Sequence, residues 1–163
     1  MKIAIFLTLI GALVAFVAMA VLQSRLELEN FRFGSNWTYG EKALRQAINE
    51  NDRSKPLLVI VPLLFPLDLF FLIFFGLFLS LLSVTHAEAL GVSASNIALV
   101  LVLPVSYMVA DLSENMLYSG MLAWPDTIGH LIVAGTWATR IKLVAVGFAI
   151  LQGLGSLVLS WRS

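Results

Sequence analysis

Four long apolar runs dominate the pattern of hydrophobic and polar positions along this chain. They cover about residues 3–22, 57–84, 96–123 and 136–161, and each is long enough for the roughly 20 residues that a helix needs to cross a bilayer. Only residues 23–56 form a long polar connection. The pattern predicts an all-α membrane protein, a four-transmembrane-helix up-down bundle that forms a single membrane domain over residues 1–163.

The first run follows Lys2 and has two interpretations, a signal peptide or a first span. A signal peptide requires a shorter apolar core and a soluble mature domain, whereas the chain beyond residue 56 is again apolar. We therefore expect a span. Gly11, Ala15 and Ala18 form a small-residue face on it, which serves either close helix packing or only as helix-favouring filler.

The polar connection contains one short amphipathic pattern. Thr38 and Glu41 have the spacing of a capping box. One apolar face follows them, formed by Ala43, Leu44, Ala47 and Ile48. These features predict a helix near residues 39–51 that lies on the bilayer surface or caps the bundle.

The second run contains Pro62 and Pro66, which remove backbone hydrogen bonds and should kink its helix just before Asp68. Residues 85–95 are expected to form a short link to the third span. Residues 127–139 are expected to form a short interfacial segment before the fourth span, which then opens with Arg140 and Lys142.

The third run carries the most polar stretch of any predicted span. Its polar side chains recur at spacings of three and four, which places them on one helix face: Tyr107, Asp111, Glu114, Asn115 and Tyr118. Ionisable groups inside a span are energetically unfavourable and usually face a bundle interior or a water-filled cavity. The pattern predicts a buried polar face on this helix.

Depth along the predicted helices brings further polar groups to the same layer. At about 1.5 Å per residue, Asp68 lies about 18 Å and Asp111 about 20 Å from one membrane face, and Arg140 and Lys142 lie about 6–10 Å from it. Long basic side chains can lean along a helix toward partners. We therefore expect one buried polar cluster, formed by Asp68, Asp111, Glu114, Asn115, Arg140, Lys142, Tyr107 and Tyr118.

Three interpretations of this cluster remain open. It can be an inter-helical packing network, a proton or cation site of a small transporter, or the centre of a metal-dependent or acid–base enzyme. The third is the weakest, because no histidine lies among these groups and His86 and His130 are expected on opposite membrane faces. The chain contains no cysteine and none of the common hydrolase or phosphate-binding motifs, and no cofactor is expected.

Composition limits the partners. Hydrophobic residues make up 60% of the chain and charged residues 12%, against roughly 25% charged residues in soluble domains. The formal net charge is zero, so bulk charge gives no reason to expect nucleic-acid binding. The expected partners are the lipid bilayer and either another membrane protein or a second copy of the chain.

Basic residues predict the orientation of the chain. Six of them lie in residues 23–56: Arg25, Arg32, Lys42, Arg45, Arg53 and Lys55. Arg140 and Lys142 are assigned to the same side, against Lys2 and Arg162 on the other. The excess predicts that the first loop is cytoplasmic and that both termini lie outside a cell inner (plasma) membrane, in a multi-pass arrangement.

Four sequence elements together resemble a group of small uncharacterised bacterial four-span integral membrane proteins. They are Phe-Pro-Leu-Asp ending at Asp68, Ala-Asp-Leu-Ser-Glu-Asn at residues 110–115, Trp-Pro at 124–125 and Thr-Arg-Ile-Lys at 139–142. The resemblance covers about residues 36–160, and the Asp-x-x-Glu-Asn element is its most specific part. It implies a bacterial four-span membrane protein and no particular activity.

The sequence thus predicts a non-enzymatic integral membrane bundle or accessory subunit with a buried polar cluster. The alternative is a small proton- or cation-coupled transporter that uses Asp68, Asp111 and Glu114.

Overall fold

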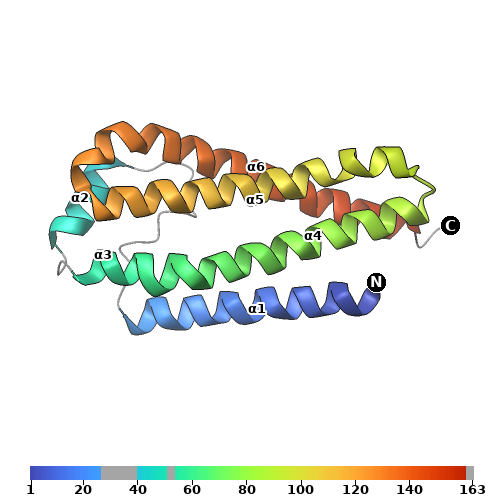
Figure 1. Cartoon of the computed structure of the whole chain (residues 1–163), viewed down its shortest axis with the longest axis horizontal. Helices are drawn as coiled ribbons and strands as arrows, with labels where there is room; N and C mark the ends of the chain where they lie inside the picture. Colours follow the sequence, from blue (N-terminus) through green and yellow to red (C-terminus); the bar gives the residue numbers. More distant parts are fainter. Residues whose placement is uncertain (27–39, 51–53, 161–163) are drawn as a thin grey trace.

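The computed structural model describes residues 1–26, 40–50 and 54–160 (Figure 1). Over these residues the chain is helical, and four helical segments are long and apolar enough to cross a membrane: Lys2–Arg25, Lys55–Glu88, Ser95–Ala123 and Pro125–Gly155. The predicted all-α bundle of four membrane-spanning helices is confirmed. The individual elements are α1 (Lys2–Arg25), α2 (Glu41–Glu50), α3 (Ser54–Leu58), η2 (Val59–Asp68), α4 (Leu69–Ala89), α5 (Ala94–Ala123), η3 (Pro125–Thr127) and α6 (Ile128–Ser160).

The spans run alternately up and down (Figure 1). The start of α1, the α4–α5 connection and the end of α6 lie at one end of the bundle, and α2, α3 and the α5–α6 connection lie at the other. Helices α4, α5 and α6 pack against one another, whereas α1 packs mainly on α4 and η2. The bundle therefore has a three-helix core with α1 on its outer side.

Small residues on α1 allow it to approach α4 closely. A Cβ atom on Gly11 would lie 2.6 Å from Cδ1 of Phe74, which is too close for any side chain at that position. Ala12 and Ala15 are buried on the same side of α1, while Ala18 is only partly buried. The predicted small-residue face is thus a packing face at Gly11 and Ala15.

The second span is bent at η2, as its two prolines predict. Val61 (φ −131°, ψ 118°) and Phe65 (φ −127°, ψ 115°) have extended backbone conformations, and each directly precedes a proline. A proline ring disfavours the helical conformation of the residue before it. Asp68 is the last residue of this bent segment and begins the regular helix α4.

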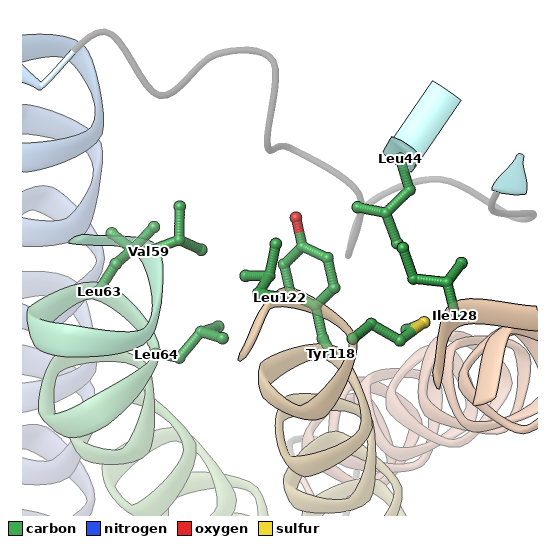
Figure 2. Packing of buried hydrophobic residues seen from close by; sticks show 8 residues of the cluster. Leu44, Val59, Leu63, Leu64, Tyr118, Leu122 and Ile128 are labelled. Carbon is green, nitrogen blue, oxygen red and sulfur yellow. The ribbon is translucent and has the colours of Figure 1, made fainter. Parts of the chain in front are cut away.

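The amphipathic helix is present as α2 and caps one end of the bundle. Its Leu44 is fully buried in a hydrophobic cluster with Tyr118, Met121 and Ile128, which belong to α5 and α6 (Figure 2). Arg45 adds a polar link, because its Nη1 donates a hydrogen bond to the carbonyl of Pro125 at 3.3 Å. Thr38, the predicted first residue of the capping box, lies outside the described residues.

The connection between α4 and α5 is shorter than predicted. Helix α4 continues to Ala89, so His86 belongs to the helix and not to a link. Gly91 has a φ of 73°, a left-handed conformation that glycine adopts without steric penalty, and its N–H donates to the carbonyl of Glu88. A tight helix end of this kind needs few residues to reverse the chain.

The fourth span begins earlier than predicted. The sequence indicates an interfacial segment over residues 127–139 and a span from 136, but only Pro125–Thr127 form a separate turn and α6 runs without interruption from Ile128. Ile128 is fully buried in the cluster around Leu44 and Tyr118, which fixes the start of the helix there. Lys142 therefore lies about 21 Å along α6, and not about 6–10 Å from the membrane face.

Candidate functional site

The polar face predicted on α5 is buried in the bundle. Each of its five side chains is at most 5% exposed: Tyr107, Asp111, Glu114, Asn115 and Tyr118. Their helical spacing directs them toward α4 and α6, the two core helices that pack on α5. The prediction of a buried polar face on α5 is confirmed, although its five side chains lie in different environments.

Lys142 of α6 forms two ion pairs with this polar face. Its Nζ lies 3.0 Å from Oδ1 of Asp111 and forms a second ion pair with Oε2 of Glu114. The side chains of Lys142, Asp111 and Glu114 are all largely buried, and that of Lys142 is the most exposed of the three, at 14%. The depth of Lys142 along α6, about 21 Å, is close to the 18 Å or so that separates Asp111 from the end of α5. One ammonium group thus connects α6 to two carboxylates of α5.

Thr139 is a member of the cluster that the sequence analysis missed. Its hydroxyl lies 2.6 Å from Oε1 of Glu114 and 3.0 Å from the carbonyl oxygen of Gly135, and it can donate to either. Thr139 is fully buried. It precedes Lys142 by three residues and so lies on the same face of α6. That spacing is the sequence signal that identifies it.

Asp68 joins the cluster from the second span. Its Oδ2 accepts a hydrogen bond of 2.5 Å from Nδ2 of Asn115. Electrostatic interactions also connect Asp68 with Asp111, Glu114 and Lys142. The predicted meeting of Asp68 and Asp111 at one depth therefore agrees with the structure, and three spans contribute to a single polar cluster.

The two tyrosines of the polar face lie in different surroundings. The Tyr107 hydroxyl donates to Oδ2 of Asp111 at 3.4 Å, and its ring meets that of Phe75 edge-on, with 5.8 Å between centroids. Tyr118 instead packs among Leu44, Met121 and other apolar side chains beneath α2 (Figure 2). The Tyr107 hydroxyl is part of the polar cluster, whereas the Tyr118 side chain packs in the hydrophobic cluster around Leu44.

Arg140 and Lys142 lie on different faces of α6. Residues two apart on a helix point about 160° away from each other, and Lys142 occupies the buried face of α6 with Thr139 and Ala145. The Arg140 guanidinium lies 5.2 Å from the ring centroid of Trp137, a side chain on the exposed side of α6. The contact that the structure gives Arg140 is thus with Trp137, and the predicted grouping of Arg140 with Lys142 in one cluster stays a prediction.

The described contacts of the cluster include more carboxyl groups than ammonium groups. Its contacts connect three carboxyl groups, those of Asp68, Asp111 and Glu114, with the ammonium of Lys142. An excess of carboxyl groups would remain even if the Arg140 charge were added. Within the contacts described, bound protons or a bound cation would balance these charges in a low-dielectric interior.

The described residues do not form a metal centre of the usual kind. Within the ranges that the structure describes, no three His, Asp or Glu side chains are grouped to hold a metal ion. His86 lies near the end of α4 and His130 near the start of α6, at opposite ends of the bundle (Figure 1). This separation agrees with the prediction that the two histidines do not meet.

Comparisons of the chain with protein-family models, curated proteins and solved structures found no match. The geometry of its own residues is therefore the basis for the function proposed below.

Proposed function

We propose that this chain is a non-enzymatic membrane component, an accessory subunit whose buried polar cluster fixes the arrangement of its spans. The observation that supports this proposal is the pair of ion pairs that Lys142 forms with Asp111 and Glu114 across α5 and α6. The hydrogen bond between Asn115 and Asp68 extends the same network to the second span.

Two physical arguments favour a packing role. Lipid tails are as apolar as the side chains that face them, so polar contacts and close packing, rather than hydrophobic burial, specify how spans associate. A buried charge is tolerated when it is paired and hydrogen-bonded. The carboxylates Asp111 and Glu114 meet this condition through Lys142, Tyr107 and Thr139.

The packing role is tested by neutralising the carboxyls one at a time. Asp111→Asn and Glu114→Gln should each reduce accumulation of the protein in the membrane and lower its unfolding temperature, because Lys142 loses a partner in each variant. Asp126→Asn, a change at an exposed acid in η3, is the matched control and should behave like the wild type. Variants that accumulate and unfold normally but lose a growth or ion-flux phenotype would contradict the packing role.

The unequal charges favour a second candidate function, a small proton- or cation-coupled transporter. Three carboxyls and one ammonium at mid-span have the composition of a site that can exchange a proton or a cation. Infrared difference spectra of the purified protein, recorded from acid to alkaline pH, test this role. A carboxyl band that titrates near neutral pH and is absent in Asp111→Asn would support transport, and the lack of any titrating band would contradict it.

The proposed location is the inner (plasma) membrane of a bacterial cell, with the first loop in the cytoplasm. Arg140 and Lys142 lie within the span, so they no longer count toward a loop. The six basic residues of 23–56 still exceed Lys2 and Arg162 on the opposite side, which supports the same orientation by the positive-inside rule.

A further inference from the structure

A groove of about 690 Å³ runs along the outer side of α1. Apart from one arginine, all of its lining side chains are apolar, among them Leu13, Val17, Val21 and Arg25 of α1 and Leu67 of η2. Leu13, Val17 and Val21 are each about half exposed, because the side of α1 that packs on the bundle is the one that carries its buried alanines. In a membrane the groove therefore faces lipid.

The groove has the length of one lipid leaflet. Its lining extends along α1 from Leu13 to Arg25, which is about 18 Å of helix. The hydrocarbon layer of one leaflet is about 15 Å thick, half of a core of roughly 30 Å. Helix α1 covers Lys2–Arg25, so Leu13 lies near its middle and Arg25 at its end. The groove thus extends from the centre of the bilayer to the level of the lipid headgroups.

Arg25 places a positive charge where the groove reaches the headgroups. Its side chain is exposed, and a long basic side chain at a helix end can extend to the membrane interface. A guanidinium group can donate two parallel hydrogen bonds to a phosphate. One basic residue at this level favours an anionic lipid over a neutral one by about fivefold. The position and the charge of Arg25 therefore match the phosphate of an anionic lipid.

A lipid chain fits the apolar part of the groove better than a second helix does. Close approach of two helices in a membrane depends on small residues at their contact. The lining of this groove consists mainly of larger branched side chains, such as those of Leu13, Val17 and Val21. An acyl chain is thin and flexible, so it can follow this surface without small residues.

We propose that the α1 groove binds an anionic phospholipid, with one acyl chain along α1 and the phosphate paired with Arg25. The lipid belongs to the leaflet at the end of the bundle that α2 caps, where α1 ends (Figure 1). None of the residues that line the groove belongs to the polar cluster. The inference therefore does not depend on the role proposed for that cluster.

Native mass spectrometry of the full-length chain tests this proposal. The chain is released from detergent micelles that contain equal amounts of phosphatidylglycerol and phosphatidylcholine with identical acyl chains. The wild type should retain about threefold more phosphatidylglycerol than phosphatidylcholine, or more. Arg25→Gln should bring the ratio of the two lipids close to one. Lys2→Gln is the matched control, because it makes the same charge change at the other end of α1, and it should keep the wild-type ratio.

A second pair of variants tests the apolar part of the groove. Val17→Trp places a large ring in the groove at an exposed position and should lower retention of phosphatidylglycerol by about threefold or more. Ile3→Trp, an exposed position of α1 outside the groove, should leave retention unchanged. Both tryptophan variants and Arg25→Gln should keep the wild-type unfolding temperature, since all three positions are exposed.

Three results would overturn the proposal. They are equal retention of the two lipids by the wild type, an unchanged ratio in Arg25→Gln, and an equal loss of preference in Lys2→Gln. Dimers of the wild type that Val17→Trp abolishes would mean that the groove accepts a second copy of the chain, and they would also overturn it. None of these results bears on the packing role, which the variants of Asp111 and Glu114 test.

Discussion

At the scale of single residues, Arg140 and Lys142 show how helix direction determines the environment of a charge. They are separated by one residue, yet Lys142 contacts Asp111 and Glu114 inside the bundle and Arg140 contacts Trp137 on its outer side. Buried positions of α6 at 138, 145 and 149 surround Lys142 on the helical wheel. The helical spacing of residues 138–149 in the sequence indicates which face of α6 each cation occupies. The distance of a residue along the span does not distinguish Arg140 from Lys142.

Removal of Lys142 and removal of Arg140 should change the free energy of unfolding by very different amounts. Lys142→Met leaves two buried carboxylates without their ammonium, and we expect a loss of about 3 kcal/mol or more in the free energy of unfolding. Arg140→Met should change it by less than about 1 kcal/mol, because the Arg140 guanidinium lies against the exposed ring of Trp137. Reversible unfolding in mixed micelles measures both values, and equal losses would contradict a larger role for Lys142 than for Arg140.

Thr139 provides a subtler test at the same scale. Thr139→Val keeps the shape of the side chain and removes the donor to Glu114, so we expect a loss of about 1 kcal/mol in the free energy of unfolding. Thr136→Val is the control, since the Thr136 hydroxyl donates to the carbonyl of Ile132 in its own helix, and it should have a smaller effect. The same unfolding assay compares them, and an equal effect of the two changes would argue against a role for Thr139 in the network.

At the scale of elements, the sequence predicts most spans well because their apolar runs and proline signals are local. The bend at η2 follows from Pro62 and Pro66, and the face of α2 follows from its amphipathic spacing. The start of α6 could not be predicted in the same way. It depends on the burial of Ile128 beneath Leu44 of α2, a contact between segments far apart in the chain.

Helix α2 should depend on its one fully buried leucine. Leu44→Ala removes the side chain that α2 inserts between α5 and α6, and large-to-small changes in cores lose about 2–5 kcal/mol. Amide hydrogen exchange should show roughly tenfold or greater loss of protection in α2, with α4 and α5 little affected. Lys42→Ala, at an exposed position of α2, is the control, and a uniform loss throughout the bundle would contradict a local capping role.

At the scale of the whole molecule, the spans alternate in direction, so the membrane side of one loop determines the side of every other connection. With α2 cytoplasmic, the α4–α5 connection must lie on the opposite side of the membrane. The chain has no cysteine, so single cysteines can report each side. In intact cells, a membrane-impermeant maleimide should label Ser93→Cys and leave Lys42→Cys unlabelled until the cells are opened. The reverse pattern would invert the proposed orientation.

Lys142 joins α6 to α5 through its ion pair with Glu114, and a double-mutant cycle measures the strength of this link. Unfolding free energies are measured for the wild type, Glu114→Gln, Lys142→Met and the double variant. If the ion pair joins the helices, the two changes should be non-additive by about 1–3 kcal/mol, with the double variant less destabilised than the sum of the single variants. Additivity to within about 0.5 kcal/mol would mean that the two residues act independently and that the ion pair does not join the helices.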